Sequence, residues 1–178
     1  GKFLVAPLSR CYKCAMNPPA SFSELRAYFE RNLNDYLDLL RQMVLINSFT
    51  ANPAGVDALG RLTADQFALL DFTAEAAPST DPRYGHHLIL TREGRSGGDA
   101  PVIGLISHLD TVFPAAEEQA NDFTWRVEGG RIYGPGTVDI KGGTVMIYMV
   151  LDGLRRFYPD VFEGVTWRIL LNAAEEVL

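Results

Sequence analysis

The chain has 178 residues, which is enough for about one domain. Hydrophobic residues make up 47% and charged residues 21%, and this ordinary globular usage excludes disordered and fibrous proteins. The formal net charge is −6 without a basic stripe, which argues against nucleic acid as a partner. Apolar runs such as Val145–Leu151 are far shorter than the roughly 18 residues of a membrane span, so we expect no membrane partner.

Residues 1–21 form a basic tail that contains two cysteines, Cys11 and Cys14. A zinc knuckle would need a second cysteine pair, and a redox site would need a βαβ context, so we interpret the two thiols as incidental. The apolar stretch Phe3–Ala6 is shorter than the core of a signal peptide. We therefore expect a cytoplasmic protein, with the periplasm and secretion left open, and a folded domain over residues 22–178.

Two helices are predicted before the first strand. Ser21–Glu24 is a capping box, and apolar residues follow it at helical spacing, so a long amphipathic helix is expected from Ser23 to Ile46. The Asn52–Gly55 run breaks this pattern, and a second helix is expected over Val56–Leu70.

The remaining pattern interleaves strands with a helix. Pro101–Ser107 is continuously apolar and β-branched, which is typical of a strand covered on both faces. A loop-rich stretch follows it to Gly130. Short strands are expected at Asp71–Ala76, His87–Thr91 and Arg131–Tyr133, a helix at Gly142–Tyr158, and a strand with alternating apolar residues at Val165–Leu171. This order predicts a layered α/β fold with a mixed sheet.

The first candidate cluster is His108 and Asp110, at the end of the apolar strand. The two-residue period of a strand places both side chains on one side. A neutral imidazole binds divalent metals well, and a nearby carboxylate can fix its tautomer. A solvated strand end is the alternative for this pair alone.

The second and third clusters are acidic. Tyr133–Gly143 surrounds Asp139 with glycines at the start of a helix, which lets the backbone approach a ligand. A plain turn with a helix cap is the alternative, whereas the phosphate-loop patterns are not matched. Glu175 and Glu176 follow the last strand, and adjacent carboxylates repel unless a cation or a shared proton holds them. Together with His108, these carboxylates are of the kind that hold two divalent metals beside a general base.

The order HLDTV, YGPGTVDIKGG and NAAEEV resembles the M20 metallopeptidases, which include glutamate carboxypeptidases, acetylornithine deacetylases and succinyl-diaminopimelate desuccinylases. The resemblance runs from about Leu37 to Leu178. It implies a three-layer α/β/α zinc-peptidase-like catalytic domain with a mixed sheet, of which this chain is expected to be the truncated N-terminal portion.

The resemblance also implies a role for each residue of the clusters. His108 is expected to bind one metal and Glu176 the other. Asp139 is expected to bridge the two metals, with a non-proline cis peptide after it. Asp110 would orient His108, and Glu175 would act as the general base. The implied cofactors are two divalent metal ions, Zn²⁺ with Co²⁺ or Mn²⁺ as alternatives.

The implied reaction is hydrolysis of an amide bond in a peptide or an N-acyl amino acid. Family members supply a further carboxylate, a lid or dimerisation domain and a final histidine, so the chain alone is expected to be inactive and the full-length parent to be able to form a homodimer. His86 and His87 are interpreted as structural or exposed. One alternative is a non-catalytic relative that acts as a binding or assembly subunit. Another is a phosphate- or nucleotide-binding domain that uses the Gly134–Gly143 loop.

Overall fold

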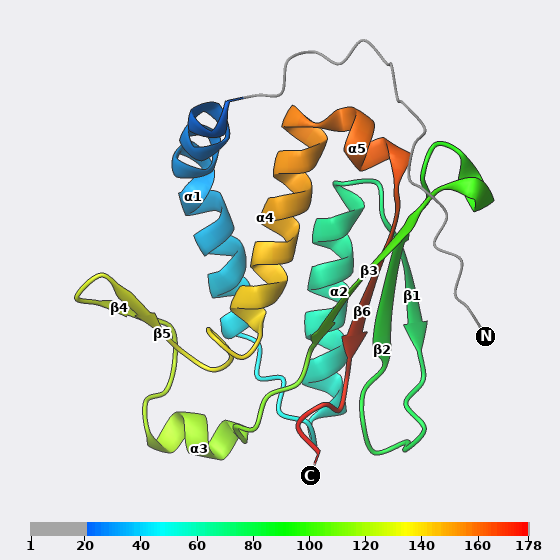
Figure 1. Ribbon diagram of the computed structural model, residues 1–178. Helices are drawn as coiled ribbons and strands as arrows, with labels where there is room; N and C mark the ends of the chain where they lie inside the picture. The colour runs from blue at the N-terminus through cyan, green and yellow to red at the C-terminus, as the bar shows by residue number, and fades with distance from the viewer. Residues whose placement is uncertain (1–20, 178) are drawn as a thin grey trace, which may run out of the picture.

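The structure, a computed structural model, describes residues 21–177 (Figure 1). The predicted tail, with Cys11 and Cys14, therefore lies outside the described residues except for Ser21. Within the described part, no helix combines the length and the apolar character that crossing a membrane requires.

The first helix begins at its predicted capping box, whereas the second begins three residues before the predicted Val56. Helix α1 (Phe22–Val44) starts at the predicted capping box, in which the Ser21 side chain accepts from the Glu24 backbone and the Glu24 carboxylate accepts from the Ser21 backbone. Helix α2 (Pro53–Ala68) is capped by the Asn52 side chain and has proline in its first turn. Both helices end two residues before the predicted positions.

Four strands form one mixed sheet in the order β1-β2-β6-β3, which confirms the predicted fold class. The strands β1 (Thr73–Ala77), β2 (His87–Arg92) and β6 (Thr166–Asn172) pair in antiparallel fashion, and β3 (Val102–His108) pairs with β6 in parallel. The parallel register places His108 opposite Asn172. The segments that follow β3 and β6 therefore leave the sheet at the same end, where both strands have their C-termini.

Helices α1, α2 and α4 (Lys141–Phe157) pack on one face of this sheet. The predicted alternation of β6 is confirmed, because Trp167, Ile169 and Leu171 are buried in the core whereas Arg168 and Leu170 face outward. The three helices meet around the ring of Tyr148 in α4, which contacts Tyr36 of α1 and Phe67 of α2 edge-on.

The prediction that the strand at 101–107 is covered on both faces was wrong. β3 lies at the edge of the sheet, where Val102 is 59% exposed and Ile106 is 78% exposed. An apolar run favours burial of both faces of a strand, but it does not identify a segment that packs on them. Among the described residues, the face that carries Ile106 and Leu170 is open to solvent.

The stretch predicted to be rich in loops contains helix α3 (Ala115–Ala120) and strand β4 (Arg126–Glu128), which pairs with the predicted β5 (Arg131–Tyr133) in a hairpin. A short helix, α5 (Pro159–Gly164), also precedes β6. These elements were not predicted because three to six residues are too few to show a periodic pattern.

The contact between α1 and α4 should make stability depend on pH. Tyr28 and Tyr36 both donate to Asp152 Oδ2, at 2.8 and 2.5 Å. Burial and then the bond to Asp152 raise the pKa of Tyr36 above its ordinary value. The folded protein therefore keeps this proton to higher pH than the unfolded chain, so the stability that Tyr36 contributes is present below about pH 10 and is lost at higher pH.

We expect the free energy of unfolding to fall more steeply between pH 9.5 and 11 in the wild type than in Tyr36→Phe. At pH 8 the variant should be less stable by about 1 to 2 kcal/mol, because it lacks the hydrogen bond to a carboxylate. Urea denaturation at several pH values measures both effects. Equal pH dependence in the two proteins would show that Tyr36 does not carry this loss.

Candidate metal centre

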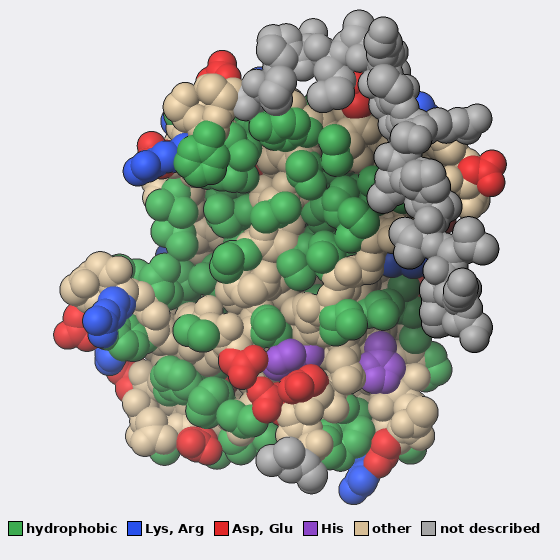
Figure 2. Space-filling view, in the orientation of Figure 1, with side chains coloured by type: hydrophobic (Ala, Val, Ile, Leu, Met, Phe, Trp, Pro, Cys, Tyr) green, Lys and Arg blue, Asp and Glu red, His purple; other side chains and the backbone are tan. Residues whose placement is uncertain are grey.

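The candidate site lies at the end of the sheet where the C-termini of β3 and β6 lie side by side. His108 is the last residue of β3, Glu175 and Glu176 follow β6, and Asp139 precedes α4. Figure 2 shows a group of acidic side chains beside a histidine at this end of the sheet. The parallel pairing of β3 and β6 is what brings the segments together.

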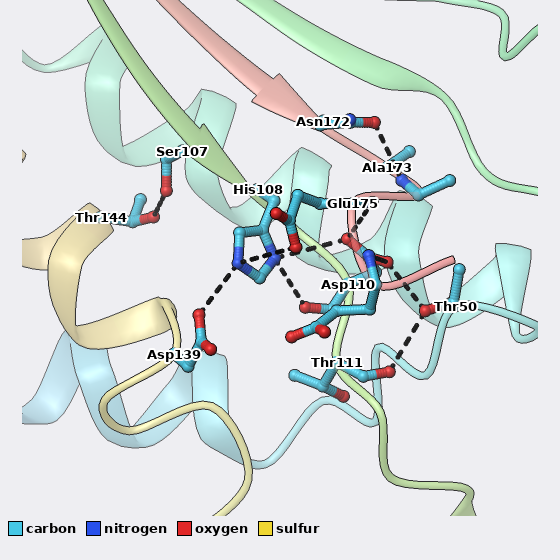
Figure 3. A network of polar contacts seen from close by, with 12 residues as sticks. Thr50, Ser107, His108, Asp110, Thr111, Asp139, Thr144, Asn172, Ala173 and Glu175 are labelled. Atoms are coloured by element: carbon cyan, nitrogen blue, oxygen red, sulfur yellow. Dashed lines mark hydrogen bonds and ion pairs between the residues drawn. The ribbon is translucent and has the colours of Figure 1, made fainter. Parts of the chain in front are cut away.

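The ring of His108 is buried and held from both sides (Figure 3). Nδ1 lies 3.0 Å from the backbone oxygen of Asp110 and 3.4 Å from its carboxylate. A carbonyl oxygen only accepts hydrogen bonds, so Nδ1 carries a proton. Nε2 then points at Asp139 Oδ1, 3.1 Å away, with Glu175 Oε2 at 3.9 Å. This orientation leaves Nε2 as the atom that could bind a metal.

Asp110 is 1% exposed and connects three segments of the chain. One of its oxygens accepts from the Glu175 backbone N–H at 3.0 Å. The other accepts from the Glu176 backbone at 3.0 Å and from the Thr50 hydroxyl at 2.7 Å. Burial raises the pKa of Asp110, but His108, Thr50 and the two backbone donors outweigh burial and lower it overall. Asp110 is therefore held as a carboxylate.

The residues fit a divalent cation. Single ligand atoms of His108, Glu175 and Glu176 all lie within 4.8 Å of one another. Burial lowers the pKa of His108, yet Asp110 and Asp139 raise it overall to about 9. Burial and then the Asp139 charge raise the pKa of Glu176. The charges of neighbouring carboxylates contribute to both shifts, and a divalent metal would offset this negative charge.

The Asp139 loop is packed tightly against the start of α4. The Asp139–Ile140 peptide is cis, as the resemblance implied. The Lys141 backbone N–H donates to Gly136 at 2.8 Å, and a Cβ on Gly142 would lie 2.2 Å from the Thr137 backbone oxygen. The glycine at 142 is therefore needed for the loop to lie where it does.

Two further residues connect the site to the segment between α1 and α2, and the sequence patterns assign neither a role. Thr50, which binds Asp110, lies within the range of the family resemblance but outside its three motifs. Lys141 is 2% exposed and donates to the Ile46 backbone oxygen at 2.9 Å. Burial lowers the pKa of Lys141 to about 8. Lys141 lies inside the YGPGTVDIKGG motif, and this position could have identified it as a residue of the site.

The structure brings together all five predicted site residues, His108, Asp110, Asp139, Glu175 and Glu176. His86 lies elsewhere and is exposed, paired with Asp57 at 3.1 Å beside a pocket of about 390 Å³ between α2 and the strands β1 and β2. A second pocket of about 310 Å³ borders the site, and it is lined by Phe49, Thr50, Ala51, Tyr84, Val112, Glu176 and Val177.

Comparison with known proteins gives the same assignment. Residues 104–178, which include all five site residues, match the model of peptidase family M20/M25/M40. Carboxypeptidase G2 from Pseudomonas sp. (strain RS-16) is 31% identical over 137 residues, which are 77% of this chain and 31% of that protein. Acetylornithine deacetylase from Proteus mirabilis (strain HI4320) is 31% identical over 128 residues, which are 69% of this chain and 31% of that protein.

The fold is also that of solved structures. The crystal structure of human carnosine dipeptidase 1 superposes with a TM-score of 0.72 at 17% identity, over 90% of this chain and 36% of that one. The chain spans about a third of the length of the curated relatives it matches. The family suggests a hydrolase that uses a divalent metal. From the three ordered motifs, the matching family model and the shared fold, the chain belongs to peptidase family M20/M25/M40.

Proposed function

We propose that the chain supplies the metal centre of a hydrolase that cleaves amide bonds in peptides or N-acyl amino acids. The observation that carries this proposal is the convergence of one imidazole and two carboxylates, with ligand atoms within 4.8 Å of one another, at the end of strands β3 and β6. The relatives support the reaction class, since one is named a carboxypeptidase and another a deacetylase. The pocket beside Glu176 offers apolar and aromatic side chains to the substrate.

The proposed cofactors are two divalent ions, Zn²⁺ with Co²⁺ or Mn²⁺ as alternatives. His108 would bind one ion, Glu176 the other, and Asp139 both. When bound, such ions supply Lewis acidity to the attacking water and to the scissile carbonyl. Glu175 lies at the open side of the site, where its carboxylate can take a proton from water and deliver it to the leaving amine. Asp110 holds the His108 ring in the tautomer that exposes Nε2.

Co²⁺ titration tests the proposal that Asp139 is a ligand of both ions. We expect two Co²⁺ per wild-type chain at saturation. His108→Ala and Glu176→Gln should each remove one ion, whereas Asp139→Ala should remove both. Visible absorption of Co²⁺ and equilibrium dialysis give the stoichiometry.

Asp38→Ala is the matched control for Asp139→Ala, because it removes the same atoms from an exposed position on α1 and should keep both ions. Retention of one or both ions by Asp139→Ala would contradict the bridging role. Absence of any Co²⁺ binding by the wild type would contradict the metal centre itself.

We also propose that the chain on its own hydrolyses no substrate. Counting Asp139 for both ions, the described site residues offer two ligands to each, whereas a catalytic zinc site has three protein ligands. An assay of the 178-residue chain with added Zn²⁺, on N-acyl amino acids and short peptides, tests this statement. Hydrolysis that a chelator abolishes would contradict it.

A further inference from the structure

The turn that carries the two glutamates is held by an unbroken series of hydrogen bonds. Four consecutive backbone N–H groups, from Ala173 to Glu176, each donate to a side chain. Asp110 receives the last two, and Asn172 Oδ1 receives the Ala174 N–H at 3.0 Å (Figure 3). The first, from Ala173, goes to Nδ1 of His87 at 3.1 Å. Neither Asn172 nor His87 has a role in the proposed reaction, but Asn172 lies in β6 itself, whereas His87 reaches the turn from the neighbouring strand β2.

The sheet places His87 on the same side as the metal site. Leu88 pairs with Leu171 and both are buried in the core, so the preceding residue, His87, faces the opposite side. His108 lies opposite Asn172 on the neighbouring strand, and Asn172 is exposed. His87 and His108 therefore flank the end of β6 from its two sides.

The two histidines use their Nδ1 atoms in opposite ways, one as an acceptor and the other as a donor. The Ala173 N–H donates to Nδ1 of His87, so this nitrogen acts as an acceptor and carries no proton. In His108 it is Nδ1 that donates, to the Asp110 backbone. His108 thus offers Nε2 as a ligand atom, whereas His87 uses Nδ1 to accept a backbone proton.

We infer that His87 is a positioning residue, which fixes the Glu175–Glu176 pair for metal binding by anchoring the Ala173 N–H. Ala173 is fully buried, so loss of the acceptor leaves a buried donor without a partner. The turn begins at this residue, and its displacement moves both glutamates relative to His108. Loss of a residue that holds a metal ligand in place typically weakens metal binding about 10- to 100-fold.

Three variants at position 87 separate this role from general packing. His87→Asn keeps an acceptor at the place of Nδ1, because Oδ1 of asparagine is equally far from Cβ. His87→Gln places its amide near the former Nε2 and leaves the Nδ1 position without an acceptor. His87→Leu removes the acceptor altogether. His86→Leu is the matched control, since His86 is exposed and paired with Asp57 away from the turn.

The inference rests on the proposed metal centre, so Co²⁺ affinity is measured with two metal-free readouts. These are exchange protection of the Ala173 amide by NMR and the free energy of unfolding in chelator. We expect the Leu and Gln variants to bind Co²⁺ about 10- to 100-fold more weakly and to lose protection at Ala173. The Asn variant and His86→Leu should stay within about threefold of the wild type and keep this protection.

The outcomes distinguish the two proposals. No Co²⁺ binding by the wild type overturns the proposed function, and the inference with it. Wild-type binding with unchanged affinity in Leu and Gln overturns the inference alone. Equal losses of affinity in Asn, Gln and Leu also overturn it, because the effect would then follow the loss of the ring rather than of the acceptor. Should the Leu variant fail to fold, the contrast between Asn and Gln decides.

Discussion

Replacement of Asp110 by alanine is expected to lower the free energy of unfolding of the metal-free chain by roughly 3 to 5 kcal/mol. The carboxylate is buried and accepts from the Glu175 and Glu176 backbones and from the Thr50 hydroxyl. Alanine leaves these donors without a partner in a partly buried turn, at about 1 to 3 kcal/mol each. The Thr50 hydroxyl also lies 3.4 Å from the Thr111 backbone oxygen, so it can be partly satisfied there.

The same substitution should weaken Co²⁺ binding about 100-fold, because the imidazole and both glutamates lose the group that holds them. Urea denaturation in chelator and Co²⁺ titration measure the two effects. Asp38→Ala, an identical change at an exposed helical position, should alter stability by less than about 0.5 kcal/mol. If Asp110→Ala were as stable as this control, Asp110 would not organise the site.

The long elements could be predicted because each repeats its signal many times. Helix α1 presents apolar residues at helical spacing over 23 residues and starts at a capping box, so both its type and its start are specified locally. Strand β6 alternates buried and exposed residues over seven positions. The hairpin strand β4 has three residues, and so short a segment carries no period.

The candidate site could be predicted because its residues occupy strand ends and the start of a helix. His108 and Asp110 are two residues apart, and the glutamates are adjacent, so local geometry already pairs them. Their assembly into one centre depends on the parallel pairing of β3 with β6. No local pattern specifies that pairing, and the order of the three motifs is what pointed to it.

The supporting residues could not be predicted, because their partners are distant in the sequence. Thr50 binds Asp110 across 60 residues, His87 binds Ala173 across 86, and Lys141 binds Ile46 across 95. Such contacts follow from strand register and helix packing, which no spacing in a single sequence encodes. The strand at β3 was predicted correctly, but the prediction that both its faces are covered was wrong for the same reason, because local sequence does not show which segments pack on a strand.

Gly142→Ala is the second substitution with a large expected effect, because two backbone segments meet at this residue. The new Cβ would lie 2.2 Å from the Thr137 oxygen, closer than the 3.0 Å that real contacts respect. Neither group is the flexible end of a side chain, so the loop must move away from α4, at a cost of roughly 2 to 4 kcal/mol. Alanine gains at most about 1 kcal/mol of helix propensity over glycine, so the clash outweighs this gain.

The movement should reach the metal centre, since Asp139 lies between Thr137 and the helix. We expect Gly142→Ala to lower the free energy of unfolding by about 1 to 3 kcal/mol and to weaken Co²⁺ binding at least tenfold. Gly164→Ala is the matched control, because no atom lies within 4 Å of its new Cβ, and it should leave both quantities nearly unchanged. A Gly142→Ala protein that loses stability but binds Co²⁺ normally would show that Asp139 does not depend on this packing. A decrease in both the free energy of unfolding and the Co²⁺ affinity would show that the backbone contact between the loop and α4 positions the proposed bridging carboxylate.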